Sequence, residues 1–185
     1  MATTRSTTVP LTAFAAGAVV SVLLGVYGAQ HEPTLEPVWT FGFDSMLAMK
    51  VYLSVIVGVL AVLQVLGALA IYGRLGFAAP SWLATGHRVS GGLTVLLSLP
   101  VAYHCLWSLG FATSDSPGRV LAHSVAGCAV YGALVVKVVA VRAGRAPGWM
   151  LPVAGGLLFA VIVVAVWTSA LWYLGEFGLP SGGGY

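Results

Sequence analysis

Five long apolar stretches dominate this sequence, at about residues 11–28, 47–72, 87–109, 120–141 and 151–174. Each has the roughly 20 residues that a helix needs to cross a hydrocarbon layer about 30 Å thick. The stretches are continuously apolar, which favours helices over the alternating strands of a barrel. Since charged residues make up only 7% of the chain and hydrophobic ones 59%, too little polar surface exists to cover a soluble core. We predict an all-α integral membrane protein, one domain over residues 1–185, whose second to fifth helices form a four-helix core.

The charged residues predict the orientation of the chain in the membrane. One face collects most basic residues, namely Arg5, Arg74, Arg88, Arg142 and Arg145. The other face collects all the acidic residues, namely Glu32, Glu36, Asp44, Asp115 and Glu176. Because basic connections stay in the cytoplasm, we expect the N-terminus inside and the C-terminus outside a cell membrane. The partner that composition implies is a lipid bilayer, and we expect no nucleic acid partner.

The first apolar stretch has an alternative interpretation as a cleaved signal peptide, because Arg5 precedes it and small residues follow it. We expect it to be retained, since the run is somewhat long for a signal core. Cleavage would leave four helices in the same orientation.

Two histidines flank the polar segment 111–118 at nearly equal distances from its middle. Folding the chain back there brings His104 and His123 to one depth, near the outer face. Ionisable groups inside a membrane are costly and usually functional. Two imidazoles at one depth predict axial ligands of a haem b, and a bis-histidine iron suits electron transfer because it leaves no open position. The alternative is that both histidines only make hydrogen bonds between helices.

Other residues near that depth fit the same site. Gly127 lies one turn beyond His123, where the absent side chain makes room for a porphyrin edge. Lys50 and Arg119 lie near outer helix ends and could each pair with a haem propionate. Ordinary snorkelling to the headgroups is the alternative for both side chains. Pro100 lies four residues before His104 and could kink the helix there.

His87 and Arg88 lie at the inner face, about 25 Å from His104 along a straight helix. His87 shares a His-x-x-x-Gly spacing with His123, which leaves a second haem open, although no other histidine lies at inner depth. Alternatively, His87 and Arg88 bind the headgroup of a quinone or lipid, or simply lie at the interface. Gln64, near the middle of its helix, should make a hydrogen bond between helices.

These histidine motifs resemble those of the transmembrane b-type cytochromes of the ferric-reductase and ascorbate-reducible group, in which a small residue follows a histidine by one turn. Most of the chain is also similar to a family of uncharacterised actinobacterial integral membrane proteins. That likeness includes Leu99-Pro-Val-Ala-Tyr-His-Cys-Leu-Trp107 and Trp167-Thr-Ser-Ala-Leu-Trp172. The cytochrome resemblance implies haem b and electron transport. It commonly implies two haems, but the single histidine in the fourth stretch favours one.

The sequence therefore predicts a membrane b-type cytochrome, either an electron-transfer protein or a subunit of an oxidoreductase in a respiratory chain. Electrons would pass from quinol or another membrane donor to an extracytoplasmic cytochrome or iron–sulfur protein. The alternative is a non-redox accessory subunit of a respiratory or transport complex. The connections between the stretches are too short to form a soluble catalytic domain, so any activity belongs to the membrane part.

Overall fold

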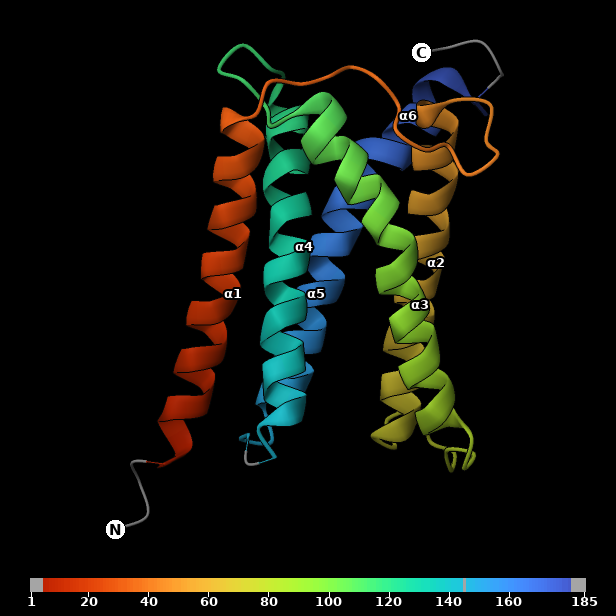
Figure 1. Ribbon diagram of the computed structural model, residues 1–185. Helices are drawn as coiled ribbons and strands as arrows, with labels where there is room; N and C mark the ends of the chain where they lie inside the picture. The colour runs from red at the N-terminus through yellow and green to blue at the C-terminus, as the bar shows by residue number, and fades with distance from the viewer. Residues whose placement is uncertain (1–4, 145, 181–185) are drawn as a thin grey trace. The chain divides into compact units, whose positions relative to one another are not determined.

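The computed structural model of the protein describes residues 5–144 and 146–180, in which there are helices and no strands (Figure 1). The elements in chain order are α1 (Arg5–Gln30), α2 (Met46–Ile71), α3 (Leu83–Tyr103), η1 (His104–Leu109), α4 (Gly118–Arg142), α5 (Met150–Val166), η2 (Trp167–Leu171) and α6 (Trp172–Phe177). Within these residues, five helical spans are long and apolar enough to cross a membrane. The prediction of an all-α multi-pass membrane protein is confirmed at that level. Arg145, one of the residues used to predict orientation, lies outside the described residues.

The predicted spans agree closely with the helices. Four of them fall inside the observed spans, and the second ends one residue later, at Tyr72, where the helix is capped. This agreement reflects the physics of the chain: the apolar runs and the hydrogen-bonded helices must end where water becomes available to the backbone.

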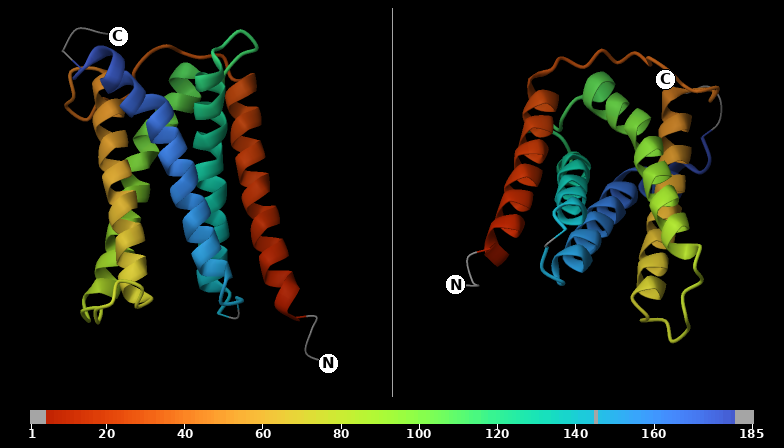
Figure 2. Two further views of the ribbon diagram at one scale, coloured as in Figure 1. Left: turned by 180° about the vertical axis from the view of Figure 1, so that it is seen from behind. Right: turned by 60° about the horizontal axis from the view of Figure 1, so that its bottom comes forward.

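The chain divides into two compact units, and the first comprises Met1–Glu32 and Gly110–Ala165. Within it α1 lies along α4, as both views in Figure 2 show. Two glycines make this contact close, because a Cβ atom built on Gly17 would lie 2.6 Å from the carbonyl oxygen of Gly132. A Cβ atom on Gly132 would lie 2.5 Å from the carbonyl oxygen of Gly17 and would collide with Ser21 Oγ. The two backbones therefore touch, as small residues allow in membrane helices.

The rest of the first unit is held by apolar packing at one end and by hydrogen bonds at the other. A buried cluster joins α1, α4 and α5 through Ala13, Val136, Ala140, Met150 and Ala154. At the other end, the connection between η1 and α4 makes hydrogen bonds to α1 and to α4. The Phe111 N–H donates to Gly28 O at 2.9 Å, and the Ala112 N–H donates to Ser124 Oγ at 3.2 Å.

The second unit comprises Pro33–Leu109 and Val166–Tyr185, and its main contact is between α2 and α3. Ser45 caps the start of α2, since its Oγ accepts the Ala48 N–H at 3.1 Å. The η2 segment also packs on α2. A Cβ atom on Gly58 of α2 would lie 3.3 Å from the side chain of Val166, the residue just before η2.

Two stretches, η1 and η2, are π-helical and continue α3 and α5. In each of them the backbone hydrogen bonds join residues five apart in the sequence, instead of the four of an α-helix. Pro100 lies one turn before η1 and cannot donate a backbone hydrogen bond. The sequence predicted a helix to residue 109 that Pro100 could kink, whereas the structure shows a change of hydrogen-bond register that begins at His104. Such π segments occur often at functional sites.

Candidate functional site

His104 is completely buried, and its two hydrogen bonds define its protonation. Its Nδ1 lies 2.8 Å from Pro100 O, and since a carbonyl oxygen can only accept, Nδ1 carries the hydrogen. Its Nε2 lies 3.2 Å from the Val38 nitrogen, and since a backbone N–H can only donate, Nε2 is the acceptor. His104 is therefore a neutral imidazole with its lone pair at Nε2, the state in which histidine binds a metal.

The segment 34–41 of the connection between α1 and α2, here named the strap, is bound across η1. The Thr34 N–H donates to Trp107 O at 3.3 Å, and the Leu35 N–H donates to Ser108 O at 3.1 Å. The buried Ser108 Oγ donates to Glu36 O at 2.9 Å. Together with the Val38 N–H on His104 Nε2, these hydrogen bonds cover the face of η1 with backbone from a distant part of the chain.

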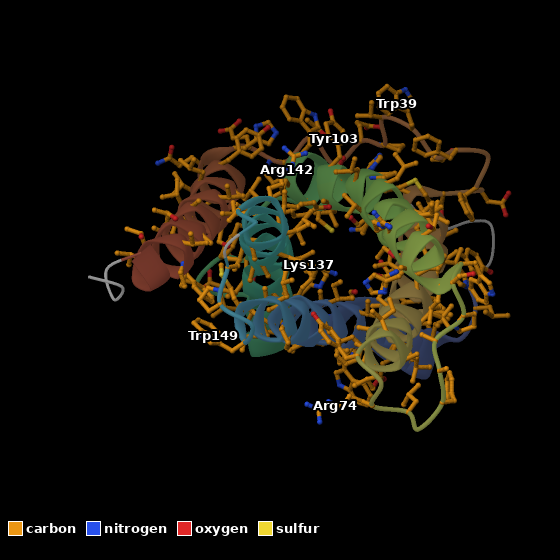
Figure 3. The ribbon with its side chains drawn as sticks, turned by 90° about the horizontal axis from the view of Figure 1, so that it is seen from below. Trp39, Arg74, Tyr103, Lys137, Arg142 and Trp149 are labelled. Carbon is orange, nitrogen blue, oxygen red and sulfur yellow. The ribbon has the colours of Figure 1, made fainter. Side chains whose placement is uncertain are left out.

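Aromatic rings continue the contact between the strap and the helix. Trp39 stacks on Tyr103 at 6.4 Å between ring centroids, and Tyr103 stacks on Trp107 at 6.0 Å. Figure 3 shows the labelled Trp39 and Tyr103 next to each other. Offset ring pairs of this kind are worth about 0.5–1.5 kcal/mol beyond the area that they bury.

The strap has a strained backbone and a largely exposed outer side. Leu35 and Phe41 have φ angles of +58° and +51°, in a region where residues other than glycine are uncommon. Each such residue costs about 1–3 kcal/mol of conformational free energy and persists only where its surroundings hold it there. The side chains of Leu35, Trp39 and Phe41 are 71%, 64% and 63% exposed. The strap is thus held by its inner side alone.

His123 lies on α4 in the first unit and is half-buried. Its Nδ1 lies 3.1 Å from Ala165 O on α5, so this nitrogen also carries a hydrogen. Ala165 comes two residues before η2, whereas Pro100 comes four residues before η1. Each histidine therefore donates its Nδ1–H to a carbonyl group close to the start of a π segment.

The two histidines lie at matching positions on their own helices. His104 is five residues before the end of η1 at Leu109, and His123 is five residues after the start of α4 at Gly118. His104 belongs to the second unit and His123 to the first. Each histidine is thus five residues from the helix end that adjoins the connection. Their pairing on one haem stays a prediction.

The other residues predicted to adjoin the haem also lie on helices. Lys50 is in the second turn of α2 and Arg119 is the second residue of α4, and both side chains are partly exposed. Their contact with haem propionates stays a prediction. A Cβ atom built on Gly127 would meet nothing within 4 Å among the described residues. The place predicted for Gly127 beside a porphyrin edge stays a prediction.

In the second unit, Gln64 bridges α2 and α3. Its Nε2 donates to His87 O at 2.9 Å and to Ser90 Oγ at 2.7 Å, which confirms the predicted hydrogen bond between helices. Its buried Oε1 has no hydrogen-bond partner among the described residues. Arg88 is exposed and its Nε donates to Ala84 O of its own helix at 3.2 Å. The structure brings His87 next to Gln64, which the sequence did not predict.

Glycines make room for this polar group. A Cβ atom on Gly67 would lie 3.2 Å from His87 Nδ1, and one on Gly91 would lie 3.2 Å from Gln64 Oε1. Within the described part of the chain, no three His, Cys, Asp or Glu side chains gather as metal ligands.

Residues 9–181 match a profile described as Family of unknown function (DUF6529). The chain belongs to this family. That membership confirms the predicted likeness to an uncharacterised family over nearly the whole chain. No curated protein and no solved structure was found to match it.

In this DUF6529 chain, sequence reasoning missed the groups that hold His104. Its partners are the Val38 N–H and the Pro100 carbonyl. Every residue offers a backbone carbonyl and every residue but proline an N–H, so neither group stands out in a sequence. Ser108 is buried in the strap contact, but a serine near a helix end carries no distinctive signal.

Proposed function

We propose that this protein is a membrane b-type cytochrome in which His104 and His123 are the axial ligands of one haem b. The observation that carries the proposal is one hydrogen bond that the two imidazoles have in common. Each donates Nδ1–H to a backbone carbonyl group, at 2.8 Å from Pro100 O and 3.1 Å from Ala165 O. Histidines that bind metals characteristically donate the other ring N–H to such an acceptor, which fixes the ring and presents Nε2.

Two further features support a haem at this end of the helices. Gly127 leaves open space one turn from His123, and the flanking aromatic rings of Tyr103 and Trp107 provide apolar surroundings. When bound, the haem would supply a one-electron redox centre. The chain would supply the ligands, the dry surroundings and, through Lys50 or Arg119, a charge for a propionate.

The proposal includes the orientation and partners expected from the sequence. The N-terminus would lie in the cytoplasm of a cell-membrane protein, the helices from α2 onward would form a four-helix core, and the haem would lie near the outer face. Quinol, or another membrane donor, would supply electrons, and an extracytoplasmic cytochrome or iron–sulfur protein would accept them. His87 and Arg88, with Gln64 beside His87, form the candidate inner site for a quinone or for a second haem.

A second candidate, a non-redox accessory subunit of a respiratory or transport complex, is favoured by one observation. Both ring nitrogens of His104 make hydrogen bonds within the second unit, so this side chain already has a structural role. In that case the histidine fastens the strap to η1, and glycine-rich helix faces would pack on the partner subunits.

A dithionite-reduced minus oxidised absorption spectrum of the purified protein separates the two candidates. We expect a low-spin b-type spectrum with one haem per chain, which is lost in His104→Ala and in His123→Ala. His31→Ala is the matched control, because it removes an imidazole that lies outside both the proposed ligand pair and the candidate inner site. A folded, colourless protein expressed with ample haem would overturn the cytochrome proposal and favour the accessory subunit.

A further inference from the structure

The strap covers the one atom of His104 that a metal would need. The neutral imidazole has a single ring lone pair available, at Nε2, and the Val38 N–H occupies it at 3.2 Å. His104 has no exposed surface, so nothing can reach Nε2 while the strap is in place. A metal and the Val38 N–H therefore compete for the same lone pair.

We infer that the strap is a displaceable cover, which leaves η1 when His104 binds haem iron. This inference rests on the proposed function. One coordinate bond to Nε2 would form, and the four hydrogen bonds between the strap and η1 would break, namely those of the Thr34, Leu35 and Val38 N–H groups and that of Ser108 Oγ. No proton or electron is transferred, and the released groups make hydrogen bonds with water instead. The Nδ1–H of His104 keeps its bond to Pro100 O, so the imidazole ring stays oriented throughout.

Two features lower the cost of releasing the strap. The side chains of Leu35, Trp39 and Phe41 are already exposed, so release uncovers only the inner side of the strap and the face of η1 beneath it. Release also lets Leu35 and Phe41 relax from their positive φ angles. Four hydrogen bonds and the stack of Trp39 on Tyr103 oppose release. One of these hydrogen bonds, from Ser108 Oγ to Glu36 O, comes from a side chain that can be replaced.

The coupling must act in both directions. If haem binding releases the strap, then any change that loosens the strap strengthens haem binding by the same factor. Ser108→Ala removes the hydrogen bond to Glu36 O and leaves both proposed ligands unchanged. Thr94→Val is the matched control, because Thr94 is a buried hydroxyl residue on α3 whose Oγ1 donates to Ser90 O in its own helix.

The test is amide hydrogen exchange of residues 34–38 in nanodiscs, measured for the haem-free protein, with haem, and with metal-free protoporphyrin. We expect slow exchange at Leu35 and Val38 without haem, and exchange at least about tenfold faster with haem. Metal-free protoporphyrin has the same size but cannot bind Nε2, so it should leave exchange slow. Ser108→Ala should speed exchange in the haem-free protein and raise haem affinity about two- to tenfold, whereas Thr94→Val should change neither.

The outcomes separate this inference from the proposed function. A bis-histidine spectrum together with slow exchange at Val38 in the haem-bound protein would overturn the displaceable strap and leave the cytochrome standing. Fast exchange with metal-free protoporphyrin as well would overturn it too, since bulk rather than coordination would then move the strap. Absence of haem binding in wild type and in Ser108→Ala alike would overturn both.

Discussion

The α1–α4 pair and the α2–α3 pair both pack through glycines, but the glycines face different neighbours. In the first pair, Gly17 and Gly132 bring one backbone against another. In the second pair, Gly67 and Gly91 face polar side chains, those of His87 and Gln64. The same residue type thus brings helices together in one unit and accommodates buried polar atoms in the other. Gly127 shows a third use, since open space adjoins it.

The largest effect should come from filling the backbone contact between α1 and α4. Gly132→Leu places a side chain against the Gly17 carbonyl group and Ser21 Oγ, and a rigid backbone cannot move aside. We expect a loss of more than about 3 kcal/mol of stability, above the usual cost of overpacking, and little folded protein. Denaturant unfolding in detergent measures it. Gly92→Leu is the control, because its Cβ atom would meet nothing within 4 Å among the described residues.

A glycine beside open space should behave in the opposite way. Gly127→Leu should leave stability within about 1 kcal/mol of wild type, as for a substitution that disturbs no packing, while haem affinity falls at least about tenfold. Haem titration and unfolding of the same sample measure both quantities. Unchanged haem binding would show that the porphyrin does not use the space beside His123, even if the histidines bind it.

A smaller effect is expected where the neighbour is the end of a flexible side chain. Gly91→Ala puts a methyl group 3.2 Å from Gln64 Oε1, so the Gln64 side chain must shift and strain its hydrogen bonds. We expect a loss of about 1 kcal/mol. In a Gln64→Ala background the same change should cost almost nothing, and a double-mutant cycle measures this coupling. Equal costs in both backgrounds would show that the strain does not come from the contact with Gln64.

The smallest effect is expected for Gln64→Leu. It removes two hydrogen bonds between α2 and α3 but also a buried Oε1 without a described partner, so the terms offset one another. Hydrogen bonds between membrane helices average about 0.6 kcal/mol, and we expect a change in stability below about 1 kcal/mol. If reduction of the haem by quinol slows markedly in this stable variant, Gln64 serves the inner quinone site rather than packing alone.

The helical spans could be predicted from sequence because the membrane constrains them strongly. An apolar run of sufficient length has few alternatives to a helix, and the bond from Gln64 followed because a mid-membrane amide needs a partner. The strap could not be predicted, since it depends on a backbone amide 66 residues from His104. The π segment at His104 was also missed, because hydropathy does not report hydrogen-bond register. The pairing of His104 with His123 stays a prediction.

The ring stack of Trp39, Tyr103 and Trp107 gives the protein an intrinsic optical reporter. Its successive planes are tilted by 28° and 14°, and aromatic rings held in such fixed, asymmetric arrangements produce near-ultraviolet circular dichroism. Trp39 is on the strap, whereas the other two rings are on α3 and η1. The movement of a few residues at the membrane surface would therefore be visible as a change in optical activity, without any label being attached.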